Sequence, residues 1–89
     1  MTETTVTMEA GLAAYKQRRF RKAAEIWSEL AEEGDAEAQY SLGILYKDGI
    51  GVPQDHTKAI EWLRKAGKSG NHNAELILSV MEDSPESEM

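Results

Sequence analysis

The chain has 89 residues and no cysteine, and its 10 Lys and Arg against 16 Asp and Glu give a formal net charge of −6. This length predicts one small domain with a thin core, and the composition excludes disulfides and thiolate metal sites. The negative charge argues against general binding to nucleic acid. No apolar run reaches the about 18 residues that a bilayer-spanning helix needs, and no signal peptide starts the chain, so we expect a cytoplasmic protein.

Apolar periodicity, together with start and stop signals, predicts five helices in chain order. They are expected at about residues 7–18, 20–33, 36–48, 56–69 and 72–82. The first four pair into two helical hairpins and the fifth stands alone, so the expected fold is all-α. The polar ends, residues 1–5 and the acidic 83–89, are expected to be flexible tails on either side of a single domain of residues 6–82.

Capping residues mark the predicted helix boundaries. Three short polar side chains that can accept hydrogen bonds from free backbone N–H groups precede helices: Asp35, Asp55 and Asn71. Three glycines follow helical runs, where the left-handed closing residue is usually glycine: Gly34, Gly49 and Gly70.

The connection YKDGIGVPQD, residues 46–55, raises the question of a phosphate-binding loop. It lacks the GxxxxGK[ST] pattern and the third glycine of the dinucleotide fingerprint. Pro53 holds Val52 extended and prevents the helix from resuming early. The segment is therefore expected to be a structural link between two helices.

The sequence repeats itself at an interval of 36 residues. KAAEIWSELAEEG, residues 22–34, aligns without a gap on KAIEWLRKAGKSG, residues 58–70, and the match continues through the next nine residues. GLAAY, residues 11–15, aligns with LGILY, residues 42–46, although the connection after it is shorter. The expected units are therefore about 7–34, 35–70 and 71–82.

The second unit resembles a Sel-one-like repeat, a relative of the tetratricopeptide repeat, over about residues 36–74. The residues that carry the resemblance are Ala38, Leu42, Gly43, Tyr46, Gly49, Gly51, Val52, Asp55, Ala59, Trp62, Ala66 and Gly70. The resemblance implies an α-α superhelix, a short solenoid of two helix-turn-helix repeats plus a final single helix. It also implies a scaffold or adaptor that binds another protein or peptide. The first unit departs from the pattern at Arg18 and Arg19, where such turns carry a glycine and an acidic residue.

In the tetratricopeptide family, partner contacts come mainly from the first helix of each unit, which lines a concave face. Carried over by position, this role falls in the first unit on Glu9, Ala13, Lys16 and Gln17. In the second unit it falls on Glu37, Tyr40, Ile44, Lys47 and Asp48, and in the last helix on Asn73, Leu76 and Val80. Tyr40 and Ile44 are large groups that the core does not require. The alternative is that they pack against the neighbouring first helices.

The last predicted helix is apolar almost all round in AELILSVM, residues 74–81. Such a helix is normally covered on more than one side. With Ala74 and Leu78 facing the preceding unit, the residues left exposed would be Ile77, Val80 or Met81. This end is therefore a candidate interface for homo-oligomers or for another protein.

The basic cluster KQRRFRK, residues 16–22, suggests an alternative function. It could bind nucleic acid or another anionic ligand, or it could be a solvated turn in which Phe20 anchors the helix. The two histidines, His56 and His72, lack further ligands at a spacing that suggests a metal site. No serine has a GxSxG setting. We expect neither an enzyme nor a cofactor.

The helix after this cluster carries its charges in the unfavourable order for the helix dipole, with bases first and acids last. Matching positions in the fourth helix have the opposite sign. The sequence therefore predicts ion pairs between two stripes: Glu25, Glu29 or Glu32 with Lys58, Arg64, Lys65 or Lys68. The expected core is built from Trp27, Leu30, Leu42, Tyr46, Trp62 and Leu63.

Overall fold

The computed structural model describes residues 6–82, in which the regular structure consists of five α-helices and no strands. They are α1 Met8–Lys16, α2 Phe20–Glu32, α3 Ala36–Asp48, α4 His56–Lys68 and α5 His72–Glu82. All predicted boundaries agree with these to within two residues. The two expected tails, residues 1–5 and 83–89, lie outside the described residues.

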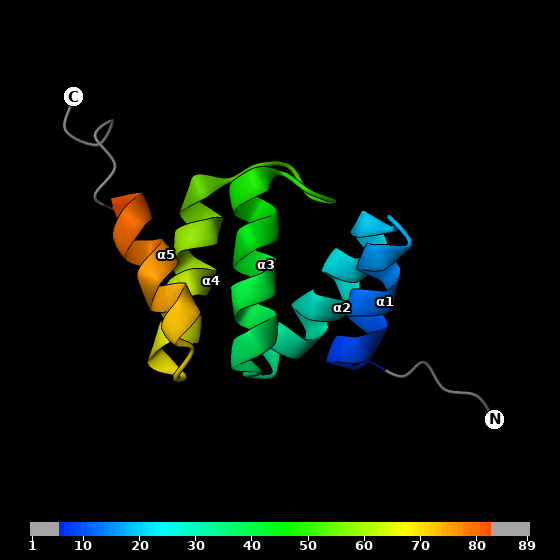
Figure 1. The fold of residues 1–89 in the computed structure, drawn as a ribbon, viewed down its shortest axis with the longest axis horizontal. Coiled ribbons are helices and arrows are strands. Elements are labelled where there is room, and N and C mark those ends of the chain that lie inside the picture. The colour runs from blue at the N-terminus through cyan, green and yellow to red at the C-terminus, as the bar shows by residue number, and fades with distance from the viewer. Residues whose placement is uncertain (1–5, 83–89) are drawn as a thin grey trace.

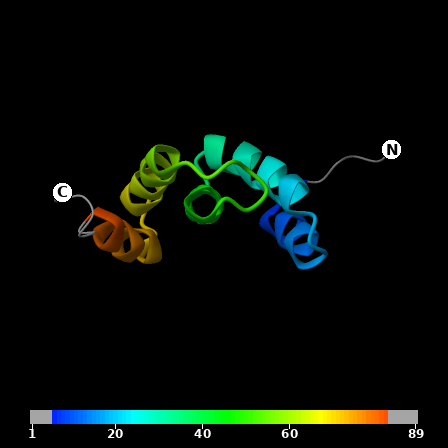
Figure 2. The same ribbon diagram turned by 90° about the horizontal axis from the view of Figure 1, so that it is seen from above.

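Each helix packs on the next one along the chain, in the order α1, α2, α3, α4, α5 (Figure 1). Seen from above, α2 and α4 form an outer row, whereas α1, α3 and α5 line the inner side of a shallow arc (Figure 2). The expected all-α solenoid of two hairpins plus a final helix is therefore confirmed. The first helix of every unit lies on the concave side.

The predicted caps form. Asp35, Asp55 and Asn71 each accept a hydrogen bond from the backbone N–H three residues on, at 3.0, 3.0 and 2.9 Å. Gly34, Gly49 and Gly70 have φ values of 101°, 69° and 102°, a region that favours glycine. The cap of α1 was not predicted; Thr7 accepts from the Ala10 N–H at 3.1 Å. By contrast, Arg19 at the start of α2 makes no side-chain capping bond.

Two glycines allow elements to approach each other closely. A Cβ on Gly43 of α3 would lie 2.8 Å from Cγ of Leu63 in α4. A Cβ on Gly51 would lie 2.4 Å from the carbonyl oxygen of Phe20, so the 49–55 link is held against the start of α2. These contacts fix the two hairpins and their connection in one packed arrangement.

The core is thin and rich in alanine. Trp27, Leu42 and Leu63 are buried as predicted, whereas the other predicted core residues, Leu30, Tyr46 and Trp62, are only half-buried. Ile26 and Leu45 are buried although they were not predicted to be. One cluster spans α1, α2 and α3. A second, smaller cluster joins α4 to α5 and consists of Leu63, Ala66 and Ala74.

The predicted ion pairs between α2 and α4 are wrong. Within residues 6–82, no Glu of α2 lies within 4.0 Å of a Lys or Arg of α4. Lys58 and Lys65 lie instead over aromatic rings, 5.4 Å from the centroid of Tyr46 and 4.7 Å from that of Trp62.

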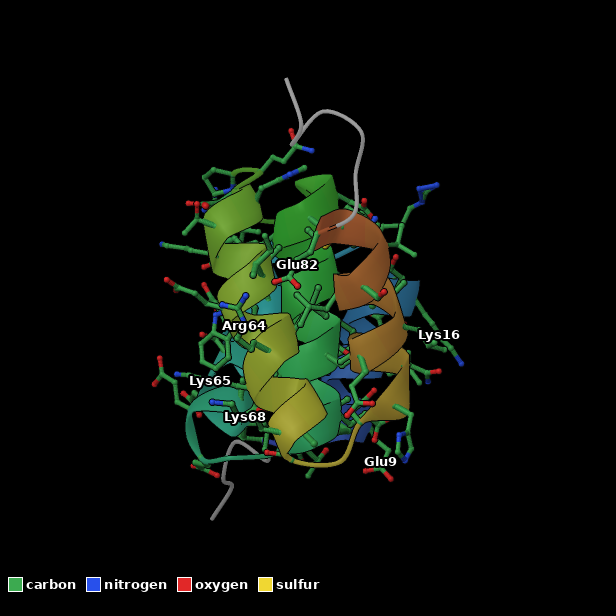
Figure 3. All side chains as sticks on the ribbon, turned by 90° about the vertical axis from the view of Figure 1, so that its left-hand side faces the viewer. Glu9, Lys16, Arg64, Lys65, Lys68 and Glu82 are labelled. Atoms are coloured by element: carbon green, nitrogen blue, oxygen red, sulfur yellow. The ribbon has the colours of Figure 1, made fainter. Side chains whose placement is uncertain are left out.

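Lys58 and Lys65 line one hollow with Glu32 of α2 but form no ion pair with it. Arg64 points toward Glu82 of α5 and forms an ion pair with it (Figure 3). Three of the four bases predicted to pair with α2 therefore contact aromatic rings or the last helix instead: Lys58, Lys65 and Arg64.

Candidate partner-binding face

The residues predicted for the concave face come from α1, α3 and α5, the three helices that line the inner side of the arc. Most of them are exposed: Glu9, Ala13, Lys16, Gln17, Glu37, Asp48, Asn73, Leu76 and Val80. Three are half-buried: Tyr40, Ile44 and Lys47. Lys47 is partly occupied within its own helix, because its Nζ lies 2.9 Å from Asp48 Oδ1.

Part of this set meets at one hollow of about 380 Å³ between the start of α3 and the turn into α5. Its lining residues are Ala36, Glu37, Tyr40, Ser41, Ser69, Gly70, Asn71 and Asn73. Of the predicted residues, the structure brings together Glu37, Tyr40 and Asn73. The hollow thus combines one aromatic ring with one carboxylate, two amides and hydroxyl groups.

Tyr40 and Ile44 also have a structural role. Both pack against the cluster of Leu63, Ala66 and Ala74. One side of each side chain therefore packs against neighbouring helices, as the alternative interpretation of the sequence predicted. The other side is solvent-accessible, since both are only half-buried. Each side chain is therefore held in place by the fold while part of it remains free for contact.

The last helix exposes a different set of residues from the one predicted. Val80 is 70% exposed, as expected, and Leu76 is 66% exposed. Ile77 and Met81, in contrast, are half-buried because they pack against the α4–α5 cluster. The exposed apolar pair on α5 is therefore Leu76 with Val80, one helical turn apart.

Sequence reasoning missed Leu12, which is 45% exposed on α1. Aligning GLAAY with LGILY put Leu12 opposite the buried Gly43. In the structure Gly11 has that role, because a Cβ there would meet the Trp27 indole just as one on Gly43 meets Leu63. An alignment of Gly11 with Gly43 would have identified Leu12 as a candidate, because it places Leu12 at the position of Ile44.

We call the resulting set the apolar row: Leu12, Tyr40, Ile44, Leu76 and Val80. Its members occur at matching positions in successive first helices, with Tyr40 and Ile44 exactly one repeat interval before Leu76 and Val80 in the alignment. They include all the large hydrophobic residues that are exposed within residues 6–82. The exposed large hydrophobic residues of the described part of the chain therefore all belong to the three helices of the inner side.

The basic cluster lies at the other end of the molecule. A shallow hollow of about 640 Å³ is lined by Arg18, Arg19, Phe20, Arg21, Lys22, Gly51, Val52 and Pro53. Its four cationic side chains are exposed, and none has an acidic partner within 4.0 Å among the described residues. Phe20 anchors the turn by an edge contact with Tyr15, 5.0 Å between ring centroids.

The described residues were also searched for metal-binding groups and membrane-spanning helices. Residues 6–82 contain no grouping of three or more His, Cys, Asp or Glu side chains that could hold a metal ion. His72 lies 3.6 Å from Glu75 and is exposed. No helix in this range is both long and apolar enough to cross a bilayer.

Comparison with known proteins agrees with this geometry. Residues 36–71 match the family model of the Sel1 repeat. The chain is 44% identical over 41 residues to the ERAD-associated E3 ubiquitin-protein ligase component HRD3A of Arabidopsis thaliana, covering 45% of this chain and 6% of that protein. It is 43% identical over 56 residues to protein sel-1 homolog 2 of Homo sapiens, covering 63% and 8%.

One further relative and one solved structure are also similar to the chain. The chitin synthase regulator SKT5 of Malassezia restricta is 34% identical over 59 residues, covering 65% of this chain and 4% of that protein. A crystal structure of a Sel1 repeat protein from Oxalobacter formigenes superposes with a TM-score of 0.64 at 20% identity, covering 81% of this chain and 44% of that chain. The chain thus spans only a small part of these curated relatives.

The family match lies on the second hairpin with its long link, and the structural match extends the same fold over most of the chain. Residues 36–71 therefore match a Sel1 repeat in sequence, and they form the centre of a short all-α solenoid.

Proposed function

We propose that this chain is a cytoplasmic protein-interaction module, without catalytic activity, that binds a polypeptide segment of a partner on the inner face of α1, α3 and α5. The observation that carries the proposal is the apolar row, which lies on the first helices and reaches the hollow beside Tyr40. Large apolar side chains exposed at matching positions of a repeat favour contact with another molecule.

The hollow supplies the features of a small anchor site. Tyr40 is fixed on one side by the α4–α5 cluster, so little side-chain freedom is lost when a partner covers the other side. Glu37 and Asn73 at its edge are exposed and can exchange hydrogen bonds with the partner's backbone or with a basic side chain. A buried aromatic anchor inside a polar rim is typical of interaction sites.

The relatives support an adaptor role. Two of them are named as a component of a ubiquitin ligase and as a regulator of a chitin synthase, so both act with other proteins. We propose that the present chain makes the same general kind of contact.

The test uses peptides selected from a random display library on the full chain, with affinities measured by fluorescence anisotropy. Glu37→Lys should weaken binding by about tenfold or more, since it reverses a charge at the edge of the hollow. Glu61→Lys makes the same charge change at an exposed position on α4 of the outer row and should have little effect. Equal loss in both variants, or peptides that map to α2, would contradict the inner face as the site.

A second candidate function is binding of nucleic acid or another anionic ligand at the basic cluster. The four exposed cations around one hollow favour it, whereas the net charge of −6 opposes a long nucleic acid. Binding to a single-stranded oligonucleotide should then weaken steeply with salt and be lost in Arg19→Glu. A shallow salt dependence, or equal loss in Lys68→Glu at the opposite end, would rule this candidate out.

A further inference from the structure

The turn between α1 and α2 gathers half of the cationic residues of the chain. Five of the 10 Lys and Arg residues lie within residues 16–22, and this stretch contains no acid. The other residues hold all 16 Asp and Glu together with the remaining five bases. The turn is therefore a positively charged patch on a molecule that is otherwise strongly acidic, and such a patch attracts negatively charged partners.

Several of these cations occupy positions where they lower the stability of the turn. Arg18 has a φ of +65° and is the only residue other than glycine with a positive φ within residues 6–82. The residue in the same position after α3 is Gly49, with a φ of 69°. Arg21 and Lys22 lie in the first turn of α2, where the helix dipole disfavours positive charge.

The start of α2 also differs from the starts of the other helices. Arg19 makes no capping hydrogen bond with its side chain. A side-chain oxygen caps each of the other four helices: Thr7, Asp35, Asp55 and Asn71. Arg18→Gly and Arg19→Asp would therefore suit the fold better than the two arginines. Local departures of this kind are typical of residues that serve a function rather than stability.

The hollow at this turn combines the charges with apolar side chains. Its lining includes four cations and three apolar residues: Arg18, Arg19, Arg21, Lys22, Phe20, Val52 and Pro53. Phe20 and Val52 are half-buried, and Gly51 holds the link against the start of α2, so the apolar part is fixed in place. A ligand that fits carries several separate negative charges and an apolar group. Carboxylates suit arginine, because a guanidinium donates two parallel hydrogen bonds to one carboxylate.

The same hollow is poorly suited to nucleic acid. Single-stranded nucleic acids bind by stacking their bases on open aromatic rings. Phe20 is the only aromatic residue of the hollow, and its half-buried ring is already in edge contact with Tyr15, 5.0 Å between centroids. Farther along α2, the exposed Glu25 and Glu29 would repel an extended phosphate backbone. A short ligand confined to the hollow avoids these acids.

We propose that the hollow at the α1–α2 turn binds a short acidic segment of a partner protein. Carboxylates of the segment contact Arg18, Arg19, Arg21 and Lys22, and an apolar side chain of the segment packs on Phe20 and Val52. The inference rests on the second candidate function, an anionic ligand at the basic cluster, and names the class of that ligand. None of the lining residues belongs to the apolar row, so the site is separate from the one proposed on the inner face.

The test compares two labelled probes on the full chain by fluorescence anisotropy. One is a peptide of glutamates around a single central leucine, and the other is an oligothymidylate with the same number of negative charges. The peptide should bind more tightly than the oligothymidylate. Its affinity should fall about tenfold as salt is raised to physiological strength, because the contacts between exposed charges are screened.

Two variants with the same change of charge serve as a matched pair. Arg19→Asp should weaken peptide binding about tenfold, because it places a like charge in the hollow, and should raise Tm by a few degrees, because it caps α2. Lys68→Asp, at an exposed position in the last turn of α4, should leave peptide binding within about twofold. It should lower Tm, because a base is lost from the negative end of a helix.

Two further variants make the assignment specific. Arg18→Gly should also raise Tm and weaken peptide binding, since it relieves the positive φ and removes one cation. A loss of binding in a variant that is more stable than the wild type cannot come from unfolding. Glu37→Lys should not weaken binding of this peptide, which separates the site from the proposed inner-face site.

The outcomes that overturn the proposal are distinct from those that overturn the second candidate function. If the oligothymidylate binds as tightly as the peptide or more tightly, an anionic site exists but its ligand is not an acidic polypeptide. If neither probe binds, both the proposal and the candidate function fail. If Arg19→Asp and Lys68→Asp weaken peptide binding equally, the hollow at the turn is not the site.

Discussion

The same substitution, glycine to alanine, is expected to have opposite effects at two helical positions. Gly43 in α3 faces α4, and a Cβ there would lie 2.8 Å from Cγ of Leu63 and 3.3 Å from the carbonyl oxygen of Ala59. Gly67 in α4 would place its Cβ 3.0 Å from Cγ of Glu75, an exposed side chain. The first neighbour is fixed and the second is free to move.

The magnitudes follow from helix propensity and packing. Alanine is better than glycine in a helix by about 1 kcal/mol. At Gly67 about half of this gain should remain, for a net stabilisation of about 0.5 kcal/mol after Glu75 moves aside. At Gly43, overpacking against the fully buried Leu63 costs about 1–3 kcal/mol. The net effect there is a destabilisation of about 1 kcal/mol.

Thermal and urea unfolding followed by circular dichroism at 222 nm measure both variants. A change of 1 kcal/mol shifts Tm by about 4–8 °C in a domain of this size. Gly43→Ala should therefore melt several degrees below the wild type, and Gly67→Ala slightly above it. If Gly43→Ala were as stabilising as Gly67→Ala, the close approach of α3 and α4 in this structure would be incorrect.

Three further substitutions test other parts of the fold by urea unfolding. Asp55→Ala removes the cap of α4 and should cost about 1 kcal/mol, and a change near zero would contradict the observed capping bond. Gly51→Ala should cost more than 1 kcal/mol, because φ is +76° and the new Cβ would meet the Phe20 carbonyl oxygen at 2.4 Å. Trp27→Ala should cost about 3–5 kcal/mol and leave the chain largely unfolded, whereas Trp62→Ala, at a half-buried position, should be milder.

The helices were predictable because their signals are local. A capping side chain such as Asp35 lies next to the N–H groups that it binds, and a closing glycine such as Gly49 acts within its own turn. The repeat interval then sets which helices pair, since each copy must bury the same side. These features need no knowledge of the rest of the molecule.

Apart from the missed Thr7 cap, the main errors concern which side chains of different helices meet. The expected pairs of Glu29 or Glu32 with Lys65 failed because the Trp62 ring lies under Lys65 and offers a contact within the same helix. Leu12 was missed because the position of α1 depends on the close contact between Gly11 and the Trp27 ring. The alignment of GLAAY with LGILY did not reveal this contact. Such choices depend on packing in three dimensions.

The residues proposed for partner binding show the same division between what the repeat predicts and what packing decides. Their place on the first helices could be predicted from the repeat, but their exposure could not, because exposure at one unit depends on whether another follows it. Tyr40 and Ile44 are half-buried where α5 follows, and the matching Leu76 and Val80 are exposed where no described helix does. The same repeat position is therefore packed in one unit and exposed in the next. In a solenoid the residues that stack the repeats are also those that can bind a partner at its end.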